Sequence, residues 1–163
     1  MTLRFVKHHQ LPGTLYLHSM PGRFEPYAEF EAEIARREIS AIVCLTGRAE
    51  MEKKSPLYAA AVAAGSVPVT QFRHVPVVDF GIPATAEEKR ALTEATRTTV
   101  TDLKAGRNVL VHCGYGHGRT GMFAIAVFLC AGMELHSATA LVAASGSAPE
   151  KDVQRAFLRS LMT

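Results

Sequence analysis

The residue types that could do chemistry gather in one short segment of the sequence, at positions 109–121. An apolar run ends at His112 and Cys113, three of the next five residues are glycine, and Arg119 opens a second apolar run. This order predicts a strand, a glycine-rich loop and a helix. Glycines let several backbone N–H groups converge, and the first N–H groups of a helix lack partners at its positive end. The segment therefore predicts an anion site that fits a phosphate.

Cys113, Arg119 and Thr120 have a spacing that would allow phosphoryl transfer to sulfur. Convergent amide donors and the helix dipole favour the thiolate, which is the nucleophilic form of Cys113. Arg119 follows after five intervening residues, so its planar guanidinium can bind two phosphate oxygens opposite the sulfur. Such a clamp favours in-line attack and offsets charge on the phosphoryl oxygens. The Thr120 hydroxyl can donate a hydrogen bond to the sulfur when it leaves in a second step.

The remaining loop residues are expected to shape the phosphate site rather than to react. His112 is expected to orient the loop by hydrogen bonds and not to titrate in catalysis. Tyr115 and His117 are expected at the rim, where stacking on an aromatic substrate and plain solvent exposure both stay open. The predicted phosphate-binding loop comprises His112, Gly114, Tyr115, Gly116, His117, Gly118 and Arg119.

Alternating strand and helix patterns predict the framework that positions this loop. Short apolar segments predict strands at 14–18, 41–45, 72–78 and 108–112, and 3.6-residue periodicity predicts helices at 26–38, 57–64, 86–105, 119–131, 135–144 and 150–161. Thr85 and Glu88 form a capping box before the third helix, and Gly106 stops it. This order predicts an α/β fold with a central, mostly parallel sheet of four to five strands flanked by helices. Ligands of such sheets bind at the carboxyl ends of the strands.

Length and charge limit the class of protein. The 163 residues predict a single domain over positions 1–163. With 18 Lys and Arg against 15 Asp and Glu, the net charge is +3 and basic runs are absent, which suits anionic substrates but disfavours nucleic acid as a partner. The apolar stretch 122–133 is too short for a membrane span, which needs ~20 residues. Residues 1–15 contain no continuous apolar signal region, and we expect a cytoplasmic protein with no membrane association.

The cysteines and the histidine pair do not indicate a metal site. Cys44, Cys113 and Cys130 are odd in number and lack CxxC spacing, which argues against both a disulfide framework and a zinc site. We expect reduced thiols, with Cys130 buried and inert within its helix. His8 and His9 have no further ligands nearby in the sequence.

The segment His112-Cys113-x-x-Gly116-x-x-Arg119-Thr120-Gly121 resembles a known signature. At every defined position it is similar to HCxxGxxR(S/T)G of the cysteine-dependent protein tyrosine phosphatase superfamily. Residues 11–17 and 42–46 resemble the first strands of its small atypical dual-specificity branch. After the signature, a Gly-Ser pair at 146–147 with Glu150 and Gln154 resembles the family's R-P-G-S…E…Q segment, but Ala144-Ser145 stands where Arg-Pro is usual.

This resemblance implies a cysteine phosphatase fold and a chemical mechanism. Cys113 would be the nucleophile, Arg119 the phosphate clamp, and Asp79, upstream in the segment 77–83, the general acid and then the general base. The reaction would pass through a phosphocysteine without metal or organic cofactor. A shallow pocket would accept phosphotyrosine as well as phosphoserine and phosphothreonine in proteins, and we expect a monomer. The family places the strand of Cys44 near the signature loop, so a reversible disulfide with Cys113 stays open beside plain core packing.

Other functions share parts of this pattern. The same mechanism serves phosphoinositide and RNA 5′-phosphatases, although the loop lacks the Lys that lipid-directed members often carry. A Cys-x5-Arg loop also occurs in arsenate reductases and sulfur-transfer enzymes. Residues 116–121 satisfy GxGxxG, but a dinucleotide site also needs a following strand that ends in an acidic residue ~20 positions on, and none is predicted. A non-catalytic phosphate-binding module is the remaining alternative.

Overall fold

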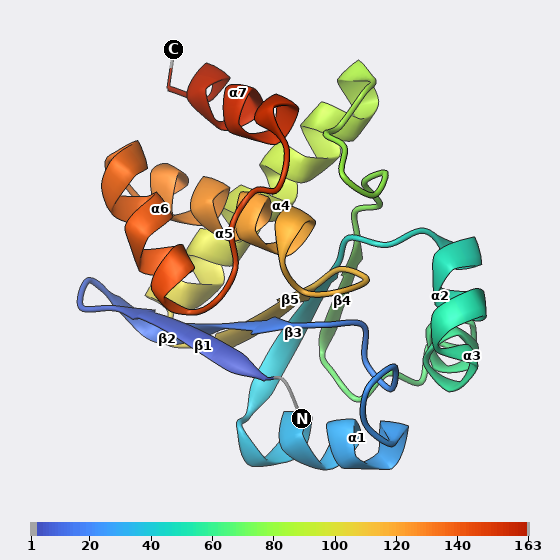
Figure 1. Ribbon diagram of the computed structural model, residues 1–163. Coiled ribbons are helices and arrows are strands. Elements are labelled where there is room, and N and C mark those ends of the chain that lie inside the picture. Colours follow the sequence, from blue (N-terminus) through green and yellow to red (C-terminus); the bar gives the residue numbers. More distant parts are fainter. Residues whose placement is uncertain (1–2, 163) are drawn as a thin grey trace.

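The computed structural model describes residues 3–162, which form a five-stranded sheet between two groups of helices (Figure 1). The strands run in the order β1-β2-β5-β3-β4. Their bounds are β1 Arg4–His8, β2 Leu11–His18, β3 Ile39–Cys44, β4 Gln71–His74 and β5 Asn108–His112. All neighbouring strands are parallel except β1, which pairs antiparallel with β2 at one edge. The expected α/β fold with a mostly parallel sheet is confirmed.

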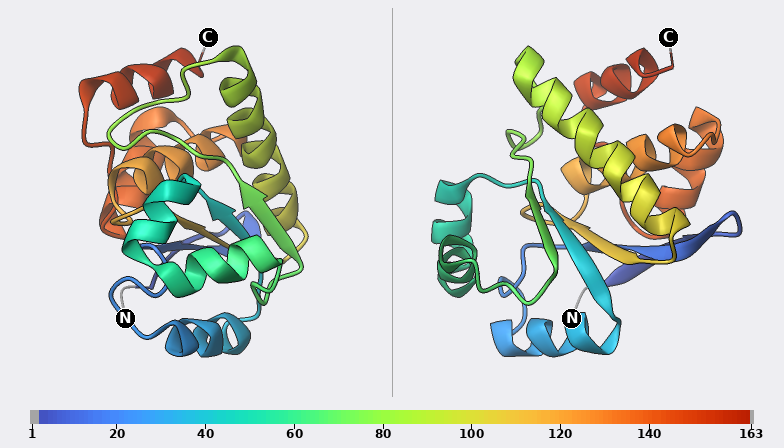
Figure 2. Two further views of the ribbon diagram at one scale, coloured as in Figure 1. Left: turned by 90° about the vertical axis from the view of Figure 1, so that its right-hand side faces the viewer. Right: turned by 180° about the vertical axis from the view of Figure 1, so that it is seen from behind.

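The helices cover both faces of this sheet. Helices α4, α5, α6 and α7 lie on one face, α1 lies on the opposite side, and α2 and α3 lie beside the ends of β3 and β4 (Figures 1 and 2). Their bounds are α1 Tyr27–Arg36, α2 Arg48–Lys54, α3 Pro56–Ala64, α4 Ala86–Lys104, α5 Gly118–Cys130, α6 Leu135–Ala144 and α7 Asp152–Ser160.

Strand β5 is buried on both faces because helices cover the sheet on both sides. Val109 and Val111 point into the large core cluster with α4, α5 and α6, whereas Leu110 packs with Phe30 and Ile34 of α1 on the other face. This burial explains why β5 reads as a continuous apolar run rather than an alternating one. Its bounds are those that the sequence predicts.

Helix α5 follows the glycine-rich loop 113–117 and passes through the core. Every residue of α5 from Gly118 to Phe128 is buried. Its apolar side chains therefore pack against neighbouring elements of the fold and do not face solvent. No helix within residues 3–162 has the length and apolar character of a membrane span.

Several local expectations are corrected by the structure. The sequence pattern does not predict β1 or α2, because each buries only one residue, Val6 and Met51 respectively, and so shows no apolar period. Strand β4 ends at His74 rather than at 78. The chain beyond it stays extended, with the N–H groups of Val75 and Val77 donating to carbonyls at the end of β3 and just after it. Cys130 is exposed at the end of α5 and not buried.

The strand register brings three strand ends together. His112 of β5 lies opposite both His18 of β2 and Cys44 of β3. The chain segments that leave these strands therefore meet at the carboxyl edge of the sheet, where ligands of parallel sheets bind. The loop from Cys113 to α5 leaves β5 at this point.

Candidate active site

The Cys113 thiol lies at the start of α5, at the bottom of the glycine-rich loop. Its Sγ accepts hydrogen bonds from the backbone N–H of Gly116 at 3.2 Å and from the Thr120 hydroxyl at 3.0 Å. The residue is only 2% exposed. Two donors on the sulfur and the positive end of the helix both favour a negative charge at this atom.

Gly116 allows this loop to turn back against strand β2. Its φ of 83° lies in the left-handed region, and a Cβ at this position would come within 2.7 Å of the Ser19 backbone nitrogen. Only glycine fits a position with both constraints. The turn is what brings the Gly116 N–H onto the Cys113 sulfur.

Arg119 is held in place by Glu50 of α2, a residue that sequence reasoning did not find. The Nη1 and Nη2 groups of Arg119 donate to the two carboxylate oxygens of Glu50, each at 2.9 Å, and Nη1 also donates to the Val77 carbonyl at 3.0 Å. Lys54 donates to the same carboxylate at 3.0 Å. Helix α2 thus fixes the direction of the arginine, and no sequence periodicity signals this partnership.

These contacts shift the pKa values of Glu50 and Arg119. Burial alone would raise the pKa of Glu50, but the hydrogen bonds from Arg119 and Lys54 lower it to about 2. Burial alone would lower the pKa of Arg119, but the Glu50 hydrogen bonds and the nearby Cys113 and Asp79 raise it above its ordinary value. The carboxylate and the guanidinium are therefore both charged at neutral pH.

The Nε–H group of Arg119 is not used by the contacts with Glu50 and Val77. Its Nε is buried and has no hydrogen-bond partner within residues 3–162. A buried N–H group without a partner is costly, so such a group in a polar pocket marks a place for an acceptor. Arg119 and Cys113 line the same pocket, and an oxyanion bound at the sulfur would supply that acceptor.

Asp79 lies at the mouth of this pocket, in the turn that follows the extended segment after β4. Its Oδ1 is 3.2 Å from Arg119 Nη2 and accepts from the Phe80 N–H at 3.0 Å. The side chain is 51% exposed. The structure therefore brings together Cys113, Arg119, Thr120 and Asp79, the four residues to which the sequence assigns chemistry.

His112 is fully buried behind the nucleophile and bridges two elements. Its Nδ1 lies 3.1 Å from the Cys113 carbonyl oxygen, and its Nε2 lies 2.8 Å from the Tyr58 hydroxyl of α3. The carbonyl only accepts, so Nδ1 carries the proton and Nε2 accepts from the tyrosine. Burial lowers the pKa of His112 to about 3. The neutral ring can orient the loop, as the sequence predicts.

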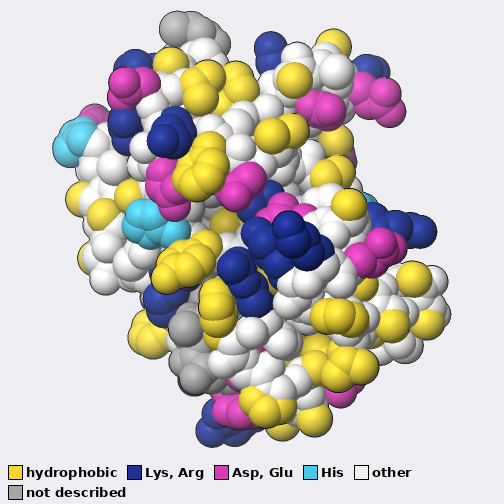
Figure 3. Space-filling view, turned by 45° about the vertical axis from the view of Figure 1, so that its right-hand side comes forward, with side chains coloured by type: hydrophobic (Ala, Val, Ile, Leu, Met, Phe, Trp, Pro, Cys, Tyr) yellow, Lys and Arg dark blue, Asp and Glu magenta, His cyan; other side chains and the backbone are white. Residues whose placement is uncertain are grey.

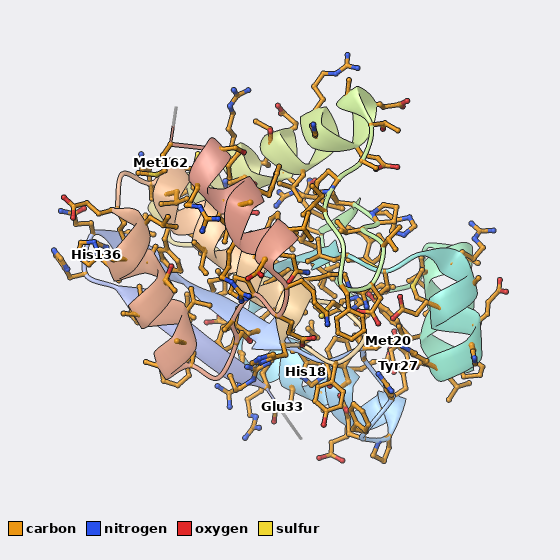
Figure 4. All side chains as sticks on the ribbon, turned by 45° about the horizontal axis from the view of Figure 1, so that its top comes forward. His18, Met20, Tyr27, Glu33, His136 and Met162 are labelled. Carbon is orange, nitrogen blue, oxygen red and sulfur yellow. The ribbon has the colours of Figure 1, made fainter. Side chains whose placement is uncertain are left out.

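The segment between β2 and α1 supports the loop from the other side. His18 Nε2 lies 2.6 Å from Glu25 Oε1, with both side chains buried, and Arg23 donates to the Gly114 carbonyl at 2.7 Å. Figure 4 shows His18, Met20 and Tyr27 gathered in this region, far from His136 and Met162. None of these supports shows a sequence signal, because each depends on contacts between distant segments.

A guanidinium from β1 lies behind the loop. Arg4 donates to the Gly116 carbonyl at 2.5 Å, to the Ser147 hydroxyl at 2.7 Å and to the Ser145 carbonyl at 3.0 Å. This is the segment in which Ala144-Ser145 departs from the usual Arg-Pro pair. The structure thus supplies an arginine here from the opposite end of the chain.

The pocket above Cys113 has a volume of 270 Å³ and a mixed aromatic and charged rim. Tyr115 is 71% exposed, and it packs edge-on against Phe24, with the Arg23 guanidinium 4.6 Å from the Phe24 ring centre. Figure 3 shows lysine and arginine side chains beside acidic ones on one face, bordered by hydrophobic side chains. The lining residues are Arg23, Lys54, Asp79, Phe80, Cys113, Tyr115, Gly118, Arg119 and Glu150.

One sequence expectation at the rim is modified. Tyr115 is exposed there as expected, but His117 directs its Nδ1 to the Gly146 carbonyl at 2.9 Å and does not line the pocket. Cys44 is buried with a free thiol that contacts Thr46 and Met51, and a reversible disulfide with Cys113 stays open beside this core packing.

The structure also bears on the alternatives. The GxGxxG segment at 116–121 is followed within the described residues by α5, α6 and α7 and by no further strand. A dinucleotide site needs that strand, so the topology of residues 3–162 argues against this interpretation. Within residues 3–162, no three His, Cys, Asp or Glu side chains are grouped as a metal site would require.

Comparisons with solved structures agree with the observed fold. Solved structures with the same fold include kinase associated phosphatase with its catalytic cysteine replaced by serine (18% identity, TM-score 0.80, covering 98% of this chain and 92% of that one) and Tk-PTP in its active form (24%, 0.71, 98% and 95%). Human DUSP28 is a third (18%, 0.65, 98% and 96%). No curated protein sequence matches significantly.

The sequence itself matches one family profile over nearly its whole length. The profile is described as Swiss Army Knife protein, DSP-PTPase phosphatase domain, and it matches residues 11–162. The matched region contains the loop, the arginine and the upstream acid described above. The chain belongs to this family of dual-specificity phosphatase domains, within the cysteine-dependent tyrosine phosphatase superfamily.

Proposed function

We propose that this protein hydrolyses phosphotyrosine and also phosphoserine and phosphothreonine in proteins, through a phosphocysteine intermediate and without a metal or organic cofactor. The observation that carries the proposal is the pairing of a sulfur that accepts two hydrogen bonds with a buried, unpartnered Arg119 Nε–H in one pocket. A phosphate between them would satisfy both groups.

In the first step, the Cys113 thiolate attacks phosphorus and forms the S–P bond while the P–O bond to the leaving group breaks. Asp79, as a carboxylic acid at the mouth, gives its proton to the departing oxygen. Arg119 and the loop N–H groups hold the three remaining phosphoryl oxygens. Glu50 keeps the guanidinium directed at them.

In the second step, a water molecule attacks the phosphocysteine and the S–P bond breaks. Asp79, now a carboxylate, takes a proton from that water, so the acid of the first step is regenerated. The negative charge returns to Cys113 Sγ. The hydroxyl of Thr120, 3.0 Å from the sulfur, stabilises the thiolate as it leaves.

The rim supports a protein substrate. Tyr115, Phe24 and Phe80 are exposed aromatic side chains around the pocket, and exposed aromatics beside cations are typical of surfaces that bind peptides. A pocket of 270 Å³ with an open rim does not select the long phosphotyrosine side chain alone.

Hydrolysis of an aryl phosphate in the presence of EDTA, with inhibition by vanadate, tests the mechanism. We expect Cys113→Ser to abolish turnover. We expect Asp79→Asn to lower turnover by ~10²–10⁴-fold for a substrate with a basic leaving group, such as phenyl phosphate, while inorganic phosphate still binds. A requirement for added metal ions would contradict the proposal. Phosphotyrosine and phosphothreonine peptides, a phosphoinositide and an RNA 5′-triphosphate, compared side by side, separate the protein substrate from the alternatives.

A further inference from the structure

The residues 77–81, which we call the acid loop, carry Asp79 and are fixed at their first residue. Val77 donates its N–H to the Leu45 carbonyl at 3.0 Å and accepts from Arg119 at its own carbonyl, also at 3.0 Å. Beyond Val77, Val78 and Phe80 are largely exposed. The half of the loop that holds Asp79 therefore needs a second attachment if the carboxyl group is to stay over the pocket.

The backbone conformation of Phe80 is a further reason to expect a second attachment of the acid loop. Its φ of 59° places a bulky residue in the left-handed region, a strained conformation that persists only when the surroundings hold it. The strained residue directly follows the proposed general acid. Gly81 closes the turn by donating its N–H to the Val78 carbonyl at 2.8 Å.

The second attachment comes from the start of α7, far along the chain. Gln154 is fully buried, and its Nε2 donates to the Gly81 carbonyl at 3.2 Å. Its Oε1 accepts from the backbone N–H groups of Glu150 at 2.8 Å and Lys151 at 3.2 Å. One buried amide thus ties the acid loop to the first turn of the helix.

Lys151 adds a contact on the neighbouring residue of the loop. Its ammonium group lies 5.1 Å from the centre of the Phe80 ring, within the range of a cation–π interaction. The start of α7 therefore holds both loop residues: Lys151 contacts Phe80, and Gln154 contacts Gly81. Both contacts hold the residues that follow Asp79, whereas Val77 fixes the loop before it.

We propose that Gln154 is a positioning residue, which holds the acid loop so that the Asp79 carboxyl group faces the leaving oxygen. This inference rests on the proposed function. The amide does not touch the reacting atoms, and its effect passes through the Gly81 carbonyl and the strained Phe80. Loss of the amide N–H should therefore impair protonation of the leaving group and leave phosphate binding by Cys113 and Arg119 intact.

The test compares kcat/KM, which reports the first chemical step, for phenyl phosphate and 4-nitrophenyl phosphate. Phenolate is the more basic leaving group and needs the proton of Asp79, whereas 4-nitrophenolate leaves without it. Asp79→Asn serves as the reference for a lost acid. Gln154→Glu removes the donor to Gly81 but keeps the oxygen that accepts from Glu150 and Lys151, and Gln154→Met removes both functions.

We expect Gln154→Glu to lower kcat/KM for phenyl phosphate about tenfold, part of the ~10²–10⁴-fold that general acid catalysis supplies, and to change the value for 4-nitrophenyl phosphate little. Inhibition by inorganic phosphate should stay as in the wild type. Gln154→Met should show the same substrate bias with a lower melting temperature. Val153→Thr, on the exposed side of the same turn, is the matched control and should behave as the wild type.

An unchanged ratio of the two substrates in Gln154→Glu, while Asp79→Asn shows the bias, would overturn this inference and leave the proposed function standing. An equal loss on both substrates in both Gln154 variants would also overturn it, because that pattern indicates a purely structural role. A wild-type protein that releases no phosphate from either substrate would overturn the proposed function, and the inference with it.

Discussion

Glu50 shows how much of the site depends on a residue outside the signature loop. Its two carboxylate oxygens occupy two nitrogens of Arg119, at 2.9 Å each, and so leave Nε for the phosphate. Arg119 is 2% exposed. A buried cation that loses its partner is strongly destabilising, whereas the intact pair contributes mainly direction.

We therefore predict that Glu50→Gln lowers kcat/KM for an aryl phosphate by about 10–100-fold, because a misplaced catalytic group costs up to ~10²-fold. The amide can accept from only one nitrogen of Arg119 and places an N–H group opposite the other. The free energy of unfolding should fall by about 1–3 kcal/mol. Steady-state kinetics and urea unfolding measure the two effects. Glu52→Gln, exposed on the same helix, is the control, and an equal effect of both changes would contradict this account.

At the level of single residues, the sequence predicts the reacting groups but not their supports. Cys113, Arg119 and Thr120 lie within eight residues, in the loop and the first turn of α5, so their proximity follows from spacing alone. Glu50 and Gln154 meet the site only because α2, which follows β3, lies near the end of β5 and because α7 begins beside the acid loop. His117 is a residue for which spacing misleads. Its place in the loop predicts that it lines the rim of the pocket, but its side chain contacts the Gly146 carbonyl instead.

Strand β1 is the element whose contribution to the site is least visible in the sequence. It is an edge strand with one buried side chain, Val6, and its charged residues resemble those of a surface segment. Yet its first residue, Arg4, reaches the back of the glycine-rich loop. Burial lowers the pKa of Arg4, and the nearby Cys113 raises it in part. The edge strand thus supplies a cation behind the sulfur.

We predict that Arg4→Met lowers kcat/KM by about tenfold, through a displaced loop and a lost positive charge behind Cys113. It should also raise the concentration of vanadate needed for half inhibition. Both values come from steady-state assays of the purified variant. Lys7→Met removes the same charge from the same strand, where Lys7 donates to the Pro12 carbonyl and the Thr14 hydroxyl. Equal losses in the two variants would show that net charge, and not the contact with Gly116, is responsible.

The elements that the sequence predicts well are those with strong apolar patterns or explicit caps. Helix α4 begins with the Thr85 and Glu88 capping box, as predicted, and Gly106 follows it with a φ of 82°. Helix α2 is charged along most of its length and buries only Met51, so the packing of Met51 with Cys44 and Tyr58 and the contact of Glu50 with Arg119 hold it in place. Such an element is defined by tertiary contacts rather than by its own pattern.

For the whole molecule, burial of His112 couples folding to pH. Its pKa is lowered to about 3 in the folded protein, whereas a histidine in the unfolded chain titrates near ~6.5. Between these values the unfolded state binds one more proton than the folded state, so stability rises with pH across this window and is lost as the pH falls. The other histidines add their own contributions, which makes a comparison with a variant necessary.

We predict that this single group makes the free energy of unfolding fall by about 1.4 kcal/mol for each pH unit below ~6.5. Urea unfolding of the wild type and of His112→Asn between pH 4.5 and 7.5 measures it. The asparagine keeps an N–H for the Cys113 carbonyl but does not titrate, so the variant should be less stable at pH 7.5 and show a flatter slope. Identical slopes in the two proteins would mean that His112 is protonated in the folded state, and then its Nε2 could not accept from Tyr58. In that case the phosphate loop would be joined to α3 by some other contact than the one seen at 2.8 Å.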